Sequence, residues 1–282
     1  MQTNSIVTDS VSSAGAFRII VAVHDNRAAV IPFVHALGLA YAAHGELEIV
    51  DVRPAEERID SIRVRTYLEK WNLLPANSKR KDVSAAGLRV QKVVRSGNKK
   101  GFIKKRIRQH PHDLLVVGTE EKHSRTGIFG SSLAAYLAEY FHRSTLFLPY
   151  NSRPFVDPET GNIALKRILI PVDEMRFYHA AMMKLLQLAK ILPKIEFEVT
   201  GIHVGGGFPQ VEYLSHPRIH WKEHICEGTV PDVIVSHADA ICADLVIMAT
   251  DGRDSIVRTI YGSKTERLLN IISCPVLSVS VR

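Results

Sequence analysis

Short runs of apolar, β-branched residues recur along the chain and alternate with longer stretches of helical periodicity. Two such runs, at residues 17–24 and 166–173, predict buried strands of a parallel sheet. Each is followed by an amphipathic stretch, at 28–43 and at 176–192, that predicts a helix, and then by another short strand. The pattern therefore predicts a strand–helix–strand unit that occurs twice.

Further along the chain, the second occurrence matches the first at a constant separation. Residues 93–97 correspond to 224–228 and residues 112–119 correspond to 243–250, in both cases 131 positions apart. Such a register, kept over about fifty residues, indicates an internal duplication rather than coincidence.

Each copy is predicted to contain five strands and about four helices, which is the pattern of a doubly wound parallel sheet. We therefore predict an α/β fold with two tandem domains, at 17–149 and 165–282. The first domain has extra residues before its third strand, and we place this insertion at 54–87. Residues 150–164, dense in Pro, Asn, Asp and Gly, are predicted to link the domains, and residues 1–16 to be a disordered leader.

The composition narrows the class of protein. Hydrophobic residues make up 46% of the chain and charged residues 23%, which is ordinary for a globular protein. The longest apolar stretch, 28–43, is too short to span a membrane, and the beginning of the sequence lacks the features of a signal peptide. The three cysteines form no C-x-x-C pair, which fits a reducing compartment. We therefore expect a cytoplasmic protein without a membrane partner.

The net charge of +7 comes from the first half of the chain, which contains 22 Lys and Arg residues and 14 Asp and Glu residues. Twelve of these cations lie between Lys79 and Arg108, with Asp82 as the one acidic residue among them. Apolar residues recur at helical spacing around Ile103 and Ile107, so the cations are predicted to form the solvated face of a helix. No aromatic residues are interleaved for base stacking, which disfavours the alternative of nucleic-acid binding.

Potential metal ligands lie close together in sequence at His216, His220, His224 and Cys226. The alternating pattern around them predicts a strand, in which His220 and His224 would be ~13 Å apart and could not share one ion. We therefore predict no metal site here. The chain also lacks G-x-S-x-G and H-E-x-x-H motifs, so no catalytic residues are assigned.

The most informative chemistry follows the fourth strand of the second copy. That strand ends in Ala249 and Thr250, and a loop containing Gly252 leads to Gly262 and Ser263, which open a predicted helix. Glycine allows a close backbone approach to an anion, and the free amides at a helix N-terminus favour phosphate. A Gly-Ser pair at this position is also ordinary N-capping, so both interpretations stay open on these residues alone.

The duplicated unit resembles the universal stress protein family in its tandem form. The resemblance rests on Pro-Val-Asp closing the first strand of the second copy, His-Val closing the next strand, and the spacing G-2x-G-9x-G-S/T after the fourth strand. In this chain Ala249 takes the place of the first glycine. The resemblance covers 17–281 and implies an adenine nucleotide alpha hydrolase-like fold.

The resemblance implies that the second copy binds ATP or a related adenine nucleotide. Asp173 would then contact the adenosine, Val204 would lie against the adenine, and the glycine loop would wrap the phosphates. The residues of this loop are Ala249, Gly252, Gly262 and Ser263, with Thr250, Arg253 and Thr265 as further candidates. Mg²⁺ could accompany the nucleotide, with Asp251 and Asp254 either as its ligands or as surface carboxylates.

The first copy departs from the family pattern. His24 stands where the family has Asp, and at the 131-residue separation Glu121 stands in the place of Gly252. A carboxylate at that point would repel a polyphosphate. We therefore predict a single nucleotide site, in the second copy.

The resemblance further implies a stress-response regulator or sensor that acts on an unknown protein partner. Two alternatives are a nucleotide-free interaction scaffold with vestigial pockets, and an enzyme with at most slow ATP hydrolysis. Members of the family often dimerise through the last strand of the fold. We therefore expect residues 145–148 and 276–281 to pair within one chain as a built-in dimer, which leaves a homodimer as a further option.

Overall fold

The computed structural model describes residues 16–23, 30–53, 63–96, 99–118, 144–250 and 271–281. The described strands are β1 (Arg18–Val23), β2 (Glu46–Arg53), β3 (Arg89–Ser96), β4 (Leu114–Gly118), β5 (Thr145–Leu148), β6 (Arg167–Pro171), β7 (Phe197–Val204), β8 (Ile219–Cys226), β9 (Leu245–Thr250) and β10 (Val276–Ser280). The described helices are α1 (Val30–Ala42), α2 (Val64–Lys70), α3 (Arg80–Ala85), α4 (Lys99–Gln109), α6 (Met175–Ile191) and α7 (Val230–Ala240).

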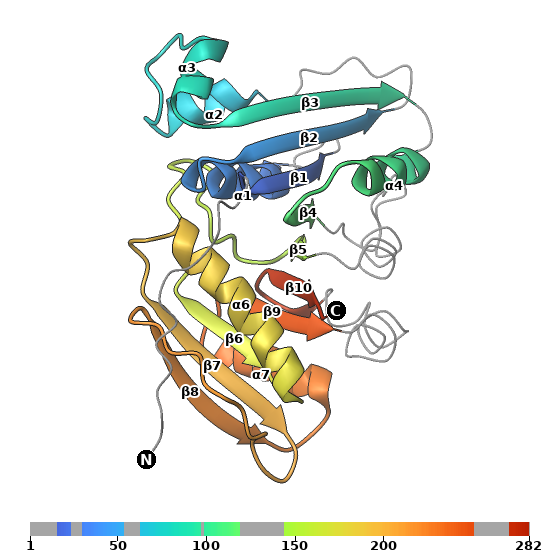
Figure 1. The fold of residues 1–282 in the computed structure, drawn as a ribbon, viewed down its shortest axis with the longest axis vertical. Helices are drawn as coiled ribbons and strands as arrows, with labels where there is room; N and C mark the ends of the chain where they lie inside the picture. Colours follow the sequence, from blue (N-terminus) through green and yellow to red (C-terminus); the bar gives the residue numbers. More distant parts are fainter. Residues whose placement is uncertain are drawn as a thin grey trace.

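These strands form one sheet in the order β3-β2-β1-β4-β5-β10-β9-β6-β7-β8 (Figure 1). Neighbouring strands run parallel except β5 and β10, which are antiparallel, with Leu146 opposite Leu277. Read from either edge to the centre, the two halves have the same strand order. The predicted pairing of 145–148 with 276–281 is confirmed, and the order favours the predicted division into two copies.

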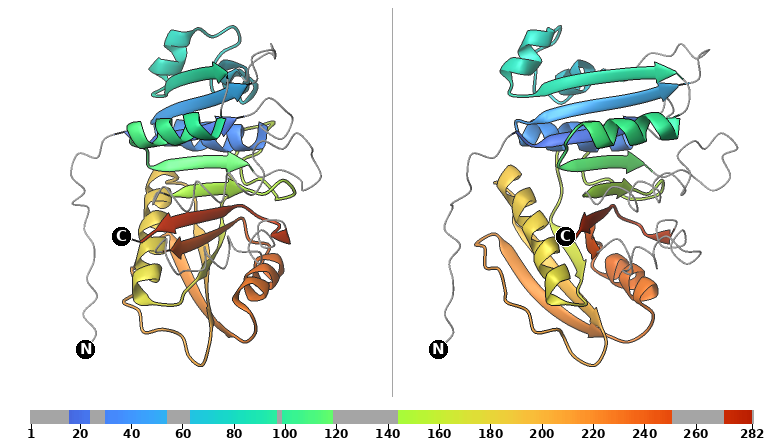
Figure 2. Two further views of the ribbon diagram at one scale, coloured as in Figure 1. Left: turned by 90° about the vertical axis from the view of Figure 1, so that its right-hand side faces the viewer. Right: turned by 45° about the vertical axis from the view of Figure 1, so that its right-hand side comes forward.

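Alternate residues of each strand face opposite helical layers, as the period of a strand requires. In β1, for example, Ile19 and Val21 are buried in the core that contains α1 and α6, whereas Ile20 and Ala22 are buried in the core that contains α4 and α7. Figure 2 shows α6 and α7 on opposite sides of the strands of the second half. The doubly wound α/β fold predicted from the sequence is therefore observed.

The connections between β2 and β3 and between β7 and β8 differ. The first contains α2 and α3, within the insertion predicted at 54–87. The second, residues 205–218, contains no helix, yet it joins two parallel strands. Aromatic and aliphatic side chains of this irregular segment, among them Phe208 and Leu214, pack on the core in place of a helix.

Residues 150–164, predicted as the linker, fold as a compact turn that is docked on the first half. Val156 forms an antiparallel bridge with Ile163. The indole nitrogen of Trp71, at the end of α2, donates a hydrogen bond to the carbonyl oxygen of Pro158 at 3.0 Å. The linker is therefore tied to the insertion of the first half.

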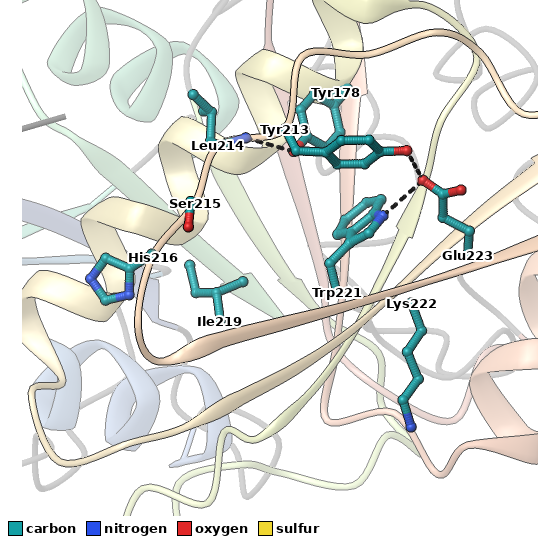
Figure 3. Close-up of a pocket in the computed structure, with 9 residues that line it drawn as sticks. All are labelled: Tyr178, Tyr213, Leu214, Ser215, His216, Ile219, Trp221, Lys222 and Glu223. Carbon is teal, nitrogen blue, oxygen red and sulfur yellow. Dashed lines mark hydrogen bonds between the residues drawn. The ribbon is translucent and has the colours of Figure 1, made fainter. Parts of the chain in front are cut away.

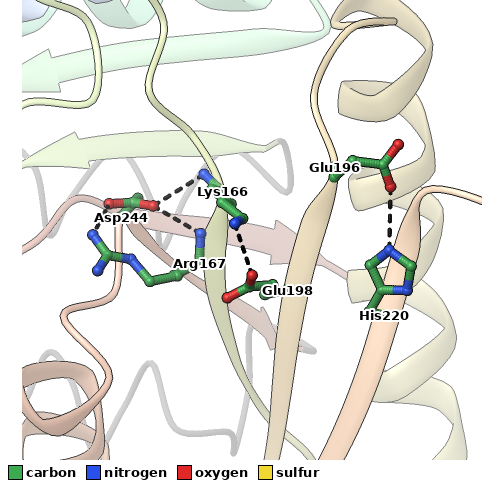
Figure 4. Close-up of polar contacts among 6 residues, drawn as sticks. All are labelled: Lys166, Arg167, Glu196, Glu198, His220 and Asp244. Atoms are coloured by element: carbon green, nitrogen blue, oxygen red, sulfur yellow. Dashed lines mark hydrogen bonds and ion pairs between the residues drawn. The ribbon is translucent and has the colours of Figure 1, made fainter.

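An aspartate in front of the fourth strand makes the same contact in both halves. The carboxylate of Asp244 accepts hydrogen bonds from the backbone N–H groups of Lys166 and Arg167, at 3.0 and 2.7 Å. It also accepts a hydrogen bond from the Arg167 guanidinium at 3.1 Å (Figure 4). In the first half Asp113 accepts the backbone N–H of Arg18 at 2.8 Å. The two aspartates are separated by the 131 positions of the predicted duplication.

We expect Asp244→Ala to lower the free energy of unfolding by about 1–2 kcal/mol, because it leaves two backbone donors and one guanidinium without their acceptor. Asp113→Ala is the matched control and should cost less, since that exposed carboxylate accepts a single backbone N–H. Urea unfolding followed by circular dichroism measures both changes. An equal or smaller loss for Asp244→Ala would contradict this assignment.

Candidate functional site

The candidate site lies at the carboxyl ends of β6, β7 and β9. β6 is the central strand of this group, with β7 paired on one side and β9 on the other. The chain leaves β6 through α6 on one face of the sheet and returns to β9 through α7 on the opposite face. Such a reversal creates a crevice at the carboxyl ends of the strands, where doubly wound sheets bind ligands.

The strand register, extended to the carboxyl ends of the strands, aligns three predicted site residues on neighbouring strands. Partners in the β6–β7 ladder are 31 positions apart and partners in the β6–β9 ladder are 77 apart. The paired residues end at Leu169 with Val246 and at Pro171 with Ile202. Extended at the same separations, the register would align Asp173, two residues after β6 ends, with Val204 and Thr250. Asp173 is exposed and Val204 is half-buried.

Ala249 occupies the position at which the family pattern has its first glycine. It is 5% exposed and lies inside β9, opposite Val279 of β10. It is not among the described residues with positive φ, so the strand accepts an alanine here without strain. The other predicted loop residues, Gly252, Arg253, Gly262, Ser263 and Thr265, lie outside the described residues, and their phosphate contacts stay predictions.

His203 joins the ends of β6 and β7 beside the site. Its ring Nδ1 lies 2.8 Å from the carbonyl oxygen of Val172, so this nitrogen carries the proton and donates. A Cβ at Gly205 would lie 2.5 Å from the other ring nitrogen, so a larger residue there would require the ring to shift. The His-Val pair of the sequence marked the strand end, but no pattern in the sequence indicated this contact.

Ser280 is a second residue that sequence reasoning missed. It is the last residue of β10 and pairs with Thr250, so it lies at the level of the site. Its Oγ is buried and has no hydrogen-bond partner among the residues that the structure describes. A serine in a terminal strand belongs to no motif, and the strand register alone brings it here.

The potential metal ligands His220, His224 and Cys226 lie in β8, the strand that the sequence predicts for them. His220 pairs with Glu196 at 3.2 Å (Figure 4). The Sγ of Cys226 lies 3.4 Å from Nε2 of His237, whose Nδ1 donates to the carbonyl oxygen of Val233. Burial raises the pKa of the Cys226 thiol, which disfavours a thiolate. Within the described ranges, no three His, Cys, Asp or Glu residues are grouped to hold a metal ion.

The basic segment forms the helix that its periodicity predicts. Ile103 and Ile107 of α4 are buried at 0% and 2% exposure, and Lys105 and Arg108 are exposed. Arg106 forms an ion pair with Glu48 of β2. The inward and outward faces of the helix are thus those predicted from the sequence. Among the described helices, none is both long and apolar enough to cross a membrane.

Comparison with known families gives a match over two regions. A family model described as the universal stress protein family matches residues 15–149 and 209–280, which together are more than half of the chain. No curated protein matches the chain significantly.

Solved structures share the fold over nearly the whole chain. A universal stress protein from Archaeoglobus fulgidus matches with a TM-score of 0.59 and 15% identity, covering 93% of this chain and 96% of that chain. A candidate universal stress protein from Pseudomonas aeruginosa matches with a TM-score of 0.60 and 16% identity over 94% of each chain. The cytoplasmic domain of a prokaryotic cation chloride cotransporter matches with a TM-score of 0.51 and 9% identity, covering 94% of this chain and 96% of that chain.

Proposed function

Since the chain belongs to the universal stress protein family, we propose that its second half binds ATP or a related adenine nucleotide. The observation that carries this proposal is the common level of Asp173, Val204 and Thr250 at the carboxyl ends of adjacent parallel strands. The three positions come from different parts of the sequence, and their alignment at the edge where doubly wound sheets bind ligands supports the proposal.

The roles follow from the chemistry of each residue. The exposed carboxylate of Asp173 is an acceptor for hydroxyl groups of the adenosine, and the half-buried Val204 offers an apolar surface to the adenine. The loop from Ala249 to Ser263 would bring backbone amides to the phosphates. Gly252 and Gly262 would allow close approach, and Arg253, Ser263 and Thr265 would add donors. Asp251 and Asp254 are candidate ligands for a Mg²⁺ ion that accompanies the nucleotide.

A nucleotide at this position would act on the surface of the protein rather than on a substrate. Binding would favour one arrangement of the 249–263 loop, and a protein partner that reads that surface would respond to it. This is the action of a stress-response regulator or sensor in the cytoplasm. The first half, whose predicted departures at His24 and Glu121 lie outside the described residues, would serve as the structural partner in a built-in dimer.

We expect calorimetric titration with ATP to give one site per chain. Asp173→Ala together with Gly262→Val should weaken binding at least tenfold, because the pair removes an adenosine acceptor and places side-chain atoms in the phosphate loop. Glu212→Ala, which removes an exposed carboxylate outside the site, is the control and should bind as the unchanged protein does. Two sites per chain, or unchanged binding by the double variant, would contradict the proposal.

The small molecules released from the purified, denatured protein distinguish the alternatives. Co-purified ATP, detected by mass spectrometry, supports the proposed regulator. ADP or AMP together with measurable turnover supports a slow ATPase, and the absence of any nucleotide supports a scaffold with vestigial pockets.

A further inference from the structure

A pocket of about 500 Å³ opens between α6, the start of β8 and the irregular connection before it (Figure 3). Three aromatic residues line it: Tyr178 from α6, Tyr213 from the connection and Trp221 from β8. Glu223 completes one end of the pocket. The pocket is wide open to solvent, and its wall combines these aromatic rings with a few polar groups.

This pocket is separate from the candidate nucleotide site. Trp221 pairs with Val199 and Glu223 pairs with Gly201, so both lie before the carboxyl end of the sheet that Val204 marks. The pocket is on the face that α6 covers rather than at the edge of the strands. A ligand in it would leave the carboxyl ends of β6 and β9 open.

The aromatic wall is held in place by close packing. The ring of Tyr178 meets the ring of Trp221 edge to face, with centroids 5.3 Å apart, and Tyr213 lies 6.4 Å from Trp221. A Cβ at Gly201 would lie 2.2 Å from the indole, so Trp221 rests directly on the sheet. Tyr178 is 1% exposed whereas Tyr213 is 52% exposed, so the pocket has a fixed floor and an accessible rim.

Glu223 supplies a negative charge beside the aromatic residues of the pocket, and Lys222 also lines the pocket. Its carboxylate accepts the hydroxyl of Tyr213 and, at 3.1 Å, the indole N–H of Trp221. Desolvation and the hydrogen bond to Glu223 raise the pKa of Tyr213 to about 12, so the phenol remains a donor. The side chain of Lys222 points away from the three aromatic rings, although this residue is part of the pocket lining (Figure 3).

We propose that this pocket binds a small organic ammonium ion. A carboxylate fixed beside aromatic rings attracts a cation both by its charge and through the π faces, and an apolar wall favours a cation with methyl or methylene groups over a hydrated metal ion. An anion would meet Glu223 at short range and be repelled. The ligand class is therefore that of quaternary and primary alkylammonium compounds.

Titration of the full chain with choline tests the proposal, using quenching of tryptophan fluorescence as the signal. The chain has two tryptophans, and the other one, Trp71, is 5% exposed and gives a constant background. We expect saturable binding of choline. 3,3-Dimethyl-1-butanol, its uncharged analogue, should bind at least tenfold more weakly, because it keeps the shape and loses the charge.

Glu223→Gln should weaken choline binding at least tenfold while keeping an oxygen that accepts both hydrogen bonds. Glu227→Gln, an exposed carboxylate outside the pocket, is the matched control and should leave choline binding unchanged. The proposal is overturned if choline does not saturate, if the uncharged analogue binds equally well, or if Glu223→Gln binds like the unchanged protein. None of these readouts depends on nucleotide binding.

Discussion

Lowering the pH from 6.5 to 4 is expected to remove about 3 kcal/mol of the free energy of unfolding through one side chain, His35. Burial lowers the pKa of this histidine from 6.5 to about 4. Between these two values the unfolded chain binds a proton that the folded protein excludes. The stabilising contribution is therefore complete above pH 6.5 and is lost as the pH falls toward 4.

The contacts of His35 explain why its neutral form is required. The ring Nδ1 lies 2.7 Å from the carbonyl oxygen of Ile31, which fixes the proton on that nitrogen. The Nε2 lone pair accepts the backbone N–H groups of Phe155 and Val156, at 3.2 and 3.3 Å. If the ring took up a second proton, Nε2 would become a donor that points at two other donors. The new proton would then have no acceptor. His35 thus ties the linker to α1 only while it is neutral.

Urea unfolding at a series of pH values measures this effect. His35→Gln should be less stable at pH 7, and its free energy of unfolding should fall less steeply between pH 6.5 and 4, because the titrating ring is gone. His220→Gln, a change at a histidine whose side chain is 60% exposed, should keep the steep dependence. If His35→Gln loses stability toward acid as steeply as the unchanged protein, His35 is not the titrating group.

The strands were predictable because their signals are local and strong. Buried parallel strands are continuous apolar runs, and the runs at 17–24 and 166–173 became β1 and β6 within a few residues of the expected bounds. The constant separation between the copies gave the register of the duplication. The pairing of β5 with β10 was expected from the resemblance to a family whose members often dimerise through the last strand, and exposed edges would have been unfavourable.

The contacts that depend on distant parts of the chain were not predictable from these patterns. The composition of 150–164 indicated a linker, but its docking depends on His35 and Trp71, which are far away in sequence. The alternation around Trp221 predicted a strand correctly, yet the pocket beside it arises because residues 205–218 replace a helix. For the candidate nucleotide site, the ends of β6, β7 and β9 were identifiable by sequence, whereas Ser280 reaches it only through strand register.

Leu277→Ala is expected to lower the free energy of unfolding by about 3 kcal/mol, because it opens a cavity at the junction of the two halves. Leu277 and its partner Leu146 are each 2% exposed, in the antiparallel ladder between β10 and β5. Among the described strands, this is the ladder that joins the halves into one sheet. Lys184 adds a contact across the same junction, since its ammonium lies 3.4 Å from the carbonyl oxygen of Asp113.

The matched control is Leu73→Ala, which removes the same atoms from a leucine that is 37% exposed and should cost less than about 1 kcal/mol. Urea unfolding of the three proteins measures the difference. A loss below about 1 kcal/mol for Leu277→Ala would mean that the ladder is not packed as described. β10 also pairs with β9, whose end holds Thr250. The junction of the two halves is therefore one strand away from the proposed nucleotide site.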